Sequence, residues 1–279
     1  MLSYKPAISD ERRFALCTYN ARSNNMLKQL IWTLCVFTLF ISAVKAEDDL
    51  TAKINHYTQL LKQNPGNVAI LIKRGDLYFK LHQFDQAIFD YSDAIKIDPH
   101  ADKAYFGRGL ALGRNGQIQD GIRDLTIYIT RHPNDSHAYT KRGVRYLWLR
   151  KNDEAKRDLE KAVSLNPKNA EAHDDLGVIL SRRRDYASAL KHFTATVSID
   201  PTYAKGWHNL AMVYYIIGQD KLALNAVNSS LDLSPDERNS LLLKAKILKD
   251  LGQTVEAEKI KENAEFLPRG NWSERVPVE

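Results

Sequence analysis

The sequence predicts an all-α solenoid, in which helix pairs stack one after another along the chain. Three observations predict this fold. Six of the nine prolines stand 34 residues apart, each interval holds two apolar runs at helical spacing, and two positions of every interval carry a small residue. The spaced prolines are Pro65, Pro99, Pro133, Pro167, Pro201 and Pro235. Each unit is therefore expected to be one helical hairpin that buries its apolar face against its neighbours.

The proline spacing divides the chain into six units: 68–101, 102–135, 136–169, 170–203, 204–237 and 238–266. In each unit the proline is expected to end the second helix, because proline has no N–H for the helical hydrogen bond and restricts the residue before it. Gly116, Gly218 and Gly252 fall at the expected turn between the two helices. A positive φ costs glycine little, so these turns can reverse the chain tightly.

The small residues predict where the two helices of a unit touch. They are Gly75, Gly109, Gly143, Gly177, Ala211 and Ala245 at the eighth position, and Ala87, Gly121, Ala155, Ala189, Ala223 and Ala257 at the twentieth. Antiparallel helices approach closely only where no bulky side chain stands between them. This pattern resembles the tetratricopeptide repeat. The resemblance implies a right-handed α-α superhelix of six helix pairs, and a protein that binds other proteins or peptides without catalysis or a cofactor.

The two ends of the repeat array are expected to be capped. Residues 47–67 form a lone helix whose apolar face includes Ile54 and Leu61, which can cover the first unit. At the other end, Lys261 replaces the apolar residue that earlier units turn toward the next one, so the last helix is expected to be a polar cap. Residues 267–279 are expected to form an irregular tail.

The N-terminal region predicts export. Residues 26–46 have the features of a signal peptide: Lys28 near the start, an uncharged apolar run over 30–44, and small residues before Glu47. Residues 1–25 are then an upstream extension. The mature chain would lack cysteine, which suits an oxidising bacterial periplasm. The alternative is a chain tethered to the membrane by an uncleaved signal, although the run is shorter than a membrane-spanning helix needs.

Composition and motifs disfavour several functions. The formal net charge is +6, but most of the excess lies in residues 1–46, so no nucleic-acid partner is expected. No catalytic or metal-binding motif occurs, and the chain is not expected to be an enzyme or to bind a metal. The glycines of 107–113 are interpreted as helix-packing residues rather than as a nucleotide loop. His173, within an acidic stretch, is interpreted as a packing residue rather than a ligand.

The resemblance implies a partner-binding groove along the first helices of the units. The expected groove residues are Phe79, Phe106, Leu110, Val144, Trp148, Val178, Met212 and Tyr215, with His208 beside them. An exposed apolar stripe of this kind typically marks a binding surface for a peptide or protein. The open alternatives are that the tail around Trp272 covers the stripe, or that part of it packs inside the solenoid. The function predicted is a scaffold that binds an extended or helical segment, in the assembly of an envelope or secretion complex.

A second candidate surface is basic. The turns between helices carry a row that we name the basic rim: Lys80, Arg114, Arg150, Lys151, Arg182, Arg183 and Arg184. Such a row could bind an anionic membrane surface, which makes a peripheral membrane adaptor the alternative function. A solvated rim without a partner is the simpler interpretation. A regulatory subunit of an enzyme is the second alternative.

Overall fold

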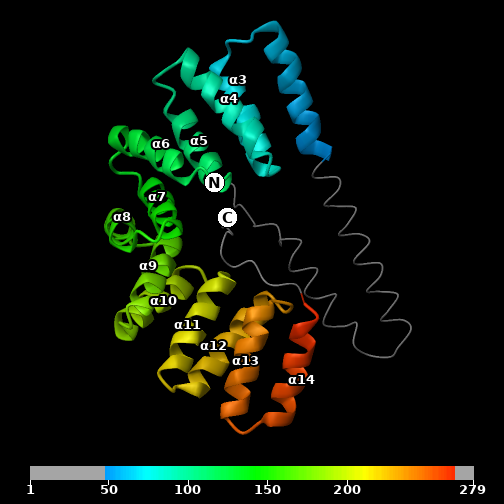
Figure 1. Ribbon diagram of the computed structural model, residues 1–279, viewed down its shortest axis with the longest axis vertical. Helices are drawn as coiled ribbons and strands as arrows, with labels where there is room; N and C mark the ends of the chain where they lie inside the picture. Colours follow the sequence, from blue (N-terminus) through cyan, green and yellow to red (C-terminus); the bar gives the residue numbers. More distant parts are fainter. Residues whose placement is uncertain (1–47, 268–279) are drawn as a thin grey trace, which may run out of the picture. The chain divides into compact units, whose positions relative to one another are not determined.

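The structure is a computed structural model that describes residues 48–267, and in this part of the chain it contains helices, turns and no strands (Figure 1). The predicted all-α repeat fold is confirmed. The upstream extension, the signal segment and residues 268–279 lie outside the described residues. None of the helices within 48–267 is both long and apolar enough to cross a membrane.

Helices follow one another in pairs along the chain. The first spans residues 48–63. The others are α3 (Val68–Lys80), α4 (Phe84–Ile97), α5 (Asp102–Arg114), α6 (Ile118–Arg131), α7 (Ser136–Trp148), α8 (Asn152–Leu165), α9 (Ala170–Arg182), α10 (Tyr186–Ile199), α11 (Ala204–Ile216), α12 (Asp220–Leu233), α13 (Arg238–Asp250) and α14 (Thr254–Glu265). The first helix of each pair begins at the first residue of the predicted unit, so the proline spacing located these helix starts.

Local sequence explains how the helices begin and end. The spaced prolines stand two residues beyond the end of the preceding helix, where they cannot continue it. Several helices start on a side-chain cap. The Asn67 Oδ1 accepts a hydrogen bond from the Ile70 N–H at 3.1 Å, and the Asp135 carboxylate accepts from the N–H groups of His137 and Ala138. Each cap satisfies a donor that the first helical turn leaves free.

The turns inside the pairs share one backbone conformation. Gly116, Gly218 and Gly252 take a positive φ, as predicted. His82 and Arg150 take the same conformation, with φ of 57° each, as does Arg184 at 63°. These six residues are spaced by 34, so the repeat imposes the left-handed turn even where the residue is not glycine.

The described chain divides into two compact units, with the boundary between Ile179 and Leu180. The first unit, residues 48–179, has a core in which Leu61 of the capping helix packs with Leu71 and Tyr91. Leu159 of α8 packs with Leu176 of α9 in the same way. The 48–63 helix thus contributes Leu61 to the core of the first repeat.

Glycines let the paired helices of the first unit touch. A β-carbon added at Gly121 in α6 would lie 2.6 Å from the backbone oxygen of Gly109 in α5, a distance that real contacts do not show. The helices therefore need glycine at this crossing, as the small-residue pattern predicted.

The second unit, residues 180–267, pairs α11 with α12 and α13 with α14. Its core includes Phe193, Val213, Val227 and Leu248, all almost completely buried. On the last helix, Lys261 lies at the surface 3.6 Å from Glu258. This polar surface fits the predicted C-terminal cap.

Candidate functional site

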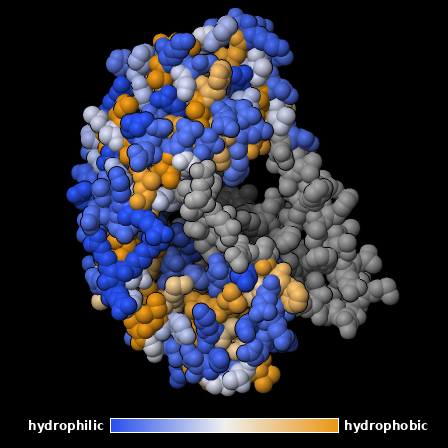
Figure 2. Space-filling model, in the orientation of Figure 1, coloured by the Kyte–Doolittle hydropathy of each residue, from blue (hydrophilic) through white to orange (hydrophobic). Residues whose placement is uncertain are grey.

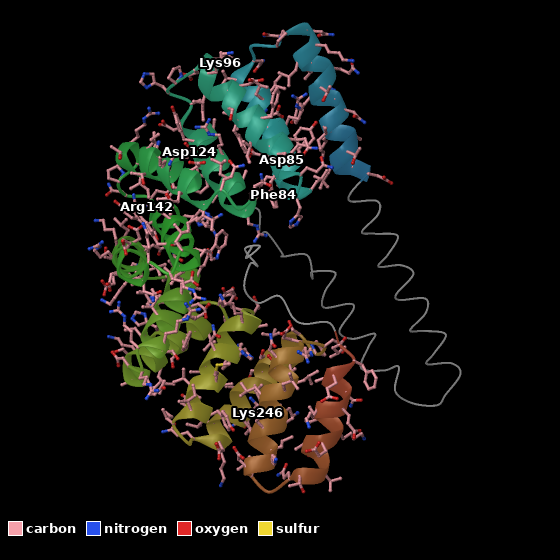
Figure 3. The ribbon with its side chains drawn as sticks, in the orientation of Figure 1. Phe84, Asp85, Lys96, Asp124, Arg142 and Lys246 are labelled. Carbon is pink, nitrogen blue, oxygen red and sulfur yellow. The ribbon has the colours of Figure 1, made fainter. Side chains whose placement is uncertain are left out.

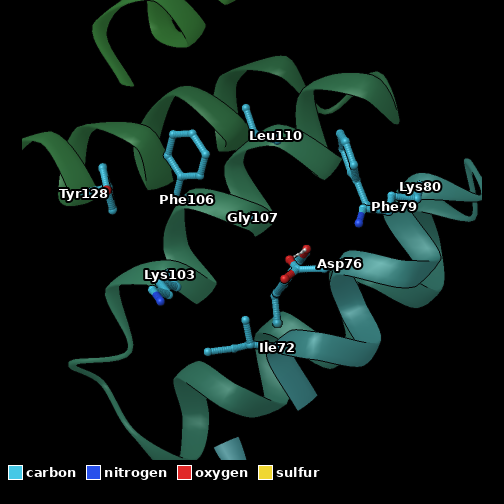
Figure 4. Close-up of a pocket in the computed structure, with 10 residues that line it drawn as sticks. Ile72, Asp76, Phe79, Lys80, Lys103, Phe106, Gly107, Leu110 and Tyr128 are labelled. Carbon is cyan, nitrogen blue, oxygen red and sulfur yellow. Dashed lines mark hydrogen bonds between the residues drawn. The ribbon is translucent and has the colours of Figure 1, made fainter. Parts of the chain in front are cut away.

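A cavity of about 320 Å³ lies in the first unit, between the neighbouring first helices α3 and α5 (Figure 4). Its lining residues come from α3, α4, α5 and α6: Ile72, Asp76, Phe79, Lys80, Tyr91, Lys103, Phe106, Gly107, Leu110 and Tyr128. The lining is mostly apolar and aromatic, with a few charged groups. Cavities of this size and composition are typical binding sites for a small group or a side chain of a partner.

Asp76 is the acidic residue in this lining. It is exposed, and its Oδ1 accepts a hydrogen bond of 2.7 Å from the hydroxyl of Tyr91. Figure 4 shows the carboxylate pointing into the space between α3 and α5. Burial raises the pKa of the Tyr91 hydroxyl, and so does its bond to Asp76, so Tyr91 remains a neutral donor. The carboxylate is thus held in one orientation.

Two glycines make room for the ring that holds Asp76. A β-carbon at Gly107 would lie 2.5 Å from the ζ carbon of Tyr91, and one at Gly75 would lie 2.9 Å from its ε1 carbon. Tyr91 is 1% exposed and belongs to the core. Gly107, which belongs to the glycine run of α5, therefore seats a core tyrosine against the cavity.

Aromatic rings build the opposite wall. Phe106 on α5 and Tyr128 on α6 have ring centroids 4.9 Å apart, and His132 stacks on Tyr128 at 4.5 Å. The Tyr128 hydroxyl donates to Asp135 at 3.0 Å. Burial and this bond raise the pKa of Tyr128 to about 12. Tyr128 therefore remains a neutral ring beside Phe106 in this wall.

The predicted groove residues fall into two groups. In the first unit, Phe79, Phe106 and Leu110 line the cavity, whereas Val144, Trp148 and Val178 are half-buried outside it. The Trp148 ring lies 4.5 Å from the guanidinium of Arg145, a buried residue. The second unit holds the other two predicted residues, Met212 and Tyr215.

In the second unit Met212 is 40% exposed, next to exposed Ile216. Tyr215 donates its hydroxyl to Asp250 at 2.8 Å. His208 differs from the expectation that it flanks the groove. It is 6% exposed, and its Nδ1 lies 2.9 Å from the hydroxyl of Ser240. Burial lowers the pKa of His208 to about 4. His208 is therefore a core residue, and Ser240 on α13 is its polar partner.

The basic rim is mostly exposed, but its members have different surroundings. Lys80 lines the cavity. Arg114 is half-buried and lies 5.9 Å from the centre of the Phe84 ring at the start of α4 (Figure 3). Arg150 and Arg184 occupy the strained turn positions. Lys151, Arg182 and Arg183 are exposed. Figure 2 shows polar side chains over most of the visible face, with small apolar patches among them.

Sequence reasoning missed a ladder of ion pairs in the first unit. In three successive pairs an arginine of the first helix donates from Nε and Nη2 to both oxygens of an aspartate of the second helix. The pairs are Arg74 with Asp90, Arg108 with Asp124, and Arg142 with Asp158. The two residues are always 16 apart, and the pairs recur every 34 residues. The recurrence of arginine and aspartate at these two repeat positions is the feature of the sequence that could have predicted the ladder.

A third contact completes each rung of this Arg–Asp ladder. The Nη1 of each arginine donates to a hydroxyl of the preceding second helix, as Arg108 does to Ser92 at 3.2 Å. Hydrogen bonding to Asp124 raises the pKa of Arg108 against the effect of burial. Figure 3 labels Asp124 and Arg142, which belong to successive rungs. The ladder ties each helix pair internally and to the helix before it.

The residues that could suggest metal or nucleotide chemistry have structural contacts. Within residues 48–267 no group of three or more His, Cys, Asp or Glu side chains is placed to hold a metal ion. Glu171 accepts hydrogen bonds of 2.7 and 2.8 Å from Lys141. Gly109 lies inside α5 against Leu125, in a helix–helix contact.

Comparisons with known proteins agree with this architecture. Residues 75–116 match the family described as TPR repeat, and residues 140–204 match the family described as tetratricopeptide repeat. The Protein SGT1 homolog of Oryza sativa subsp. japonica is 30% identical over 77 residues, which are 28% of this chain and 21% of that protein. The match thus spans about a fifth of the length of the curated relatives.

Solved structures share the fold at low identity. A tetratricopeptide repeat protein from Parabacteroides merdae is 18% identical with a TM-score of 0.64, over 82% of this chain and 91% of that one. YrrB, described as a TPR protein with an unusual peptide-binding site, is 22% identical with a TM-score of 0.51, over 66% of this chain and 95% of that one. The chain therefore contains tetratricopeptide repeats over 75–116 and 140–204, and it shares the all-α repeat fold of these solved structures.

Proposed function

We propose that this protein is a non-catalytic scaffold that binds an extended segment of a partner protein in the cavity between α3 and α5. The observation that carries the proposal is the cavity itself. Phe79, Phe106 and Leu110, which were predicted as groove residues, line a space of about 320 Å³. A side chain of the partner can bury its apolar surface there, and burial of this kind supplies most of the affinity at a protein interface.

The likeness to YrrB, whose description names a peptide-binding site, supports this proposal. Both chains share the repeat fold, and in this chain the first helices present an apolar and aromatic surface. An extended segment can lie along such a surface with alternate side chains pointing into it. The polar residues at the edge of the cavity then fix the register of the segment.

A selection experiment tests the function while the partner is still unidentified. The full chain is immobilised and used to select binders from a random-peptide library. We expect the wild-type protein to enrich a family of related sequences. Phe106→Asn, which removes one aromatic wall of the cavity, is expected to lose that enrichment.

Phe89→Asn is the matched control, because Phe89 is 63% exposed, also lies in the first unit, and does not line the cavity. It is expected to select the same peptides as the wild type. Thermal melts of both variants check the fold. Equal enrichment by wild type and Phe106→Asn, with both folded, would contradict the proposed site.

The proposed setting is the cell envelope, where the scaffold would help to assemble an envelope or secretion complex. It rests on the sequence alone: the uncharged run over 30–44 and the small residues before Glu47. If the chain is exported and processed, N-terminal sequencing of the mature protein begins at Glu47. Recovery of residues 26–46 on a membrane-bound form would instead support the uncleaved signal.

A further inference from the structure

We propose that Asp76 makes the cavity between α3 and α5 selective for a lysine or arginine side chain of the bound segment. This inference rests on the proposed function and adds the chemistry of the partner. It starts from the position of one carboxylate, which is the acidic group of a lining otherwise built from apolar, aromatic and basic residues.

The Asp76 carboxylate is oriented by a hydrogen bond from Tyr91 and can accept further hydrogen bonds from a ligand. Tyr91 donates to one oxygen at 2.7 Å, and no other described residue forms a hydrogen bond or ion pair with Asp76. A carboxylate can accept about four hydrogen bonds in total. Because Tyr91 is buried and wedged against Gly75 and Gly107, the carboxylate is held in place before a ligand arrives. A fixed acceptor of this kind favours a charged donor over a neutral one.

The walls suit the stem of a long basic side chain. Ile72 and Leu110 offer aliphatic surface, and Phe79 and Phe106 offer rings. Lysine and arginine bury their methylene groups along such surfaces while the charged head reaches a polar partner. Aromatic rings near the head add a favourable interaction with the cation. An acidic side chain would instead bring a second negative charge next to Asp76.

Two lysines also border the cavity, and they influence which groups of the bound segment lie next to its basic residue. Lys103 and Lys80 lie on either side of Asp76 in the view of Figure 4. Both are exposed, and neither forms an ion pair with Asp76. Their flexible heads can move into solvent, whereas Asp76 is held by Tyr91. The lysines therefore favour carbonyl or acidic groups next to the basic residue of the segment, not in its place.

The test compares peptides selected by the full chain. Among peptides that depend on Phe106, we expect enrichment of lysine or arginine over the starting library. A capped synthetic peptide from the selected family is then titrated by fluorescence anisotropy, beside a copy with the basic residue changed to methionine. The Asp76→Asn variant and the methionine copy are each expected to bind about tenfold more weakly, as loss of a charge-assisted hydrogen bond predicts.

The two changes together give a coupling measurement. If the basic residue contacts Asp76, the methionine copy is expected to bind the Asp76→Asn variant with the same affinity as it binds the wild type. Asparagine still offers an oxygen to Tyr91, so this variant is expected to keep its melting temperature. Tyr91→Phe keeps the buried ring but frees the carboxylate, and it is expected to reduce the preference for the basic peptide over its methionine copy. Asp120→Asn, at an exposed carboxylate outside the cavity, is the control and is expected to change neither affinity.

The outcomes separate the two proposals. No selection by the wild type, or selection independent of Phe106, means that the proposed function is wrong. Phe106-dependent peptides that lack a basic residue, or that bind Asp76→Asn as tightly as wild type, overturn this inference alone. Residues 268–279 contain Arg269 and Arg275. Peptide binding that appears only after these residues are removed would overturn an external partner in favour of the chain's own tail.

Discussion

The two units solve the same packing problem with different chemistry. In the first unit, the seventh and twenty-third positions of the three complete repeats hold the Arg–Asp ladder, whose aspartates are buried. In the second unit, the corresponding residues of one repeat are Leu210 and Ala226, both buried. The helices pair in both units, α5 with α6 and α11 with α12. The fold therefore needs this site to be filled, but not charged.

This comparison separates stability from specificity. A buried ion pair must offset the loss of hydration of both ions, so an apolar pair of suitable shape can stabilise a fold as well. The Arg–Asp ladder adds a fixed relative orientation of the helices. Each planar guanidinium donates two hydrogen bonds to one aspartate in a single geometry, and its third hydrogen bond goes to the preceding helix. Two of these pairs, Arg74 with Asp90 and Arg108 with Asp124, lie on the helices that also build the cavity, so we infer that they fix the positions of α3 and α5 around it.

The largest expected effect comes from breaking one rung. Arg108→Leu leaves the Asp124 carboxylate buried without its guanidinium and is expected to lower the free energy of unfolding by about 3 kcal/mol. The double change Arg108→Leu with Asp124→Ala copies the pair found at Leu210 and Ala226 and is expected to restore most of this loss. Urea unfolding followed by circular dichroism measures both. A double variant as unstable as the single one would show that the first unit needs the charges themselves.

The second expected effect belongs to the second unit and depends on pH. His208 is buried with its pKa lowered to about 4, whereas the unfolded chain titrates near 6.5. The unfolded state therefore binds the proton first, and stability falls as the pH drops from 6.5 toward 4. The expected loss at pH 5 is about 2 kcal/mol relative to pH 7.

His208→Gln removes this titration. We expect it to reduce the difference in stability between pH 7 and pH 5, measured by urea unfolding at both values. Because Gln can still bond Ser240, the variant is expected to fold at pH 7. An unchanged pH dependence in the variant would mean that other groups carry the acid sensitivity.

The sequence predicted the fold because the repeat constrains backbone and packing at fixed positions. The proline spacing located the helix starts, and the small residues marked the contacts between helices, including Gly109 with Gly121. Three of the residues predicted for the groove, Phe79, Phe106 and Leu110, line the cavity. The cavity itself was not predicted, because Tyr91 and Tyr128, which also line it, come from second helices.

The missed features depend on three-dimensional contacts. The Arg–Asp ladder has the same period as the prolines, but which aspartate meets which arginine depends on how the two helices face each other. His208 stands at the repeat position that Ile72 and Phe106 hold in the first unit, where both line the cavity. It is buried instead, with its Nδ1 against the hydroxyl of Ser240. A single sequence shows neither contact directly, so side-chain direction and pairing had to come from the structure.

The smallest expected effect tests the turns, where the two units again differ. The second unit uses glycine, Gly218 and Gly252, in two of its three turns and Arg184 in the other. The first unit uses glycine only in the turn at Gly116 and has His82 and Arg150 in the other two. A left-handed conformation costs a residue with a β-carbon about 1 kcal/mol. Arg150→Gly is therefore expected to stabilise the chain by up to about 1 kcal/mol, less the entropy that glycine loses on folding.

Gly116→Ala is the converse change: a β-carbon there meets nothing within 4 Å, so its expected cost of about 1 kcal/mol comes from φ alone. Thermal melts of both variants check the sign. If Arg150→Gly destabilises the chain instead, the arginine side chain makes a contact at the rim worth more than the strain it imposes.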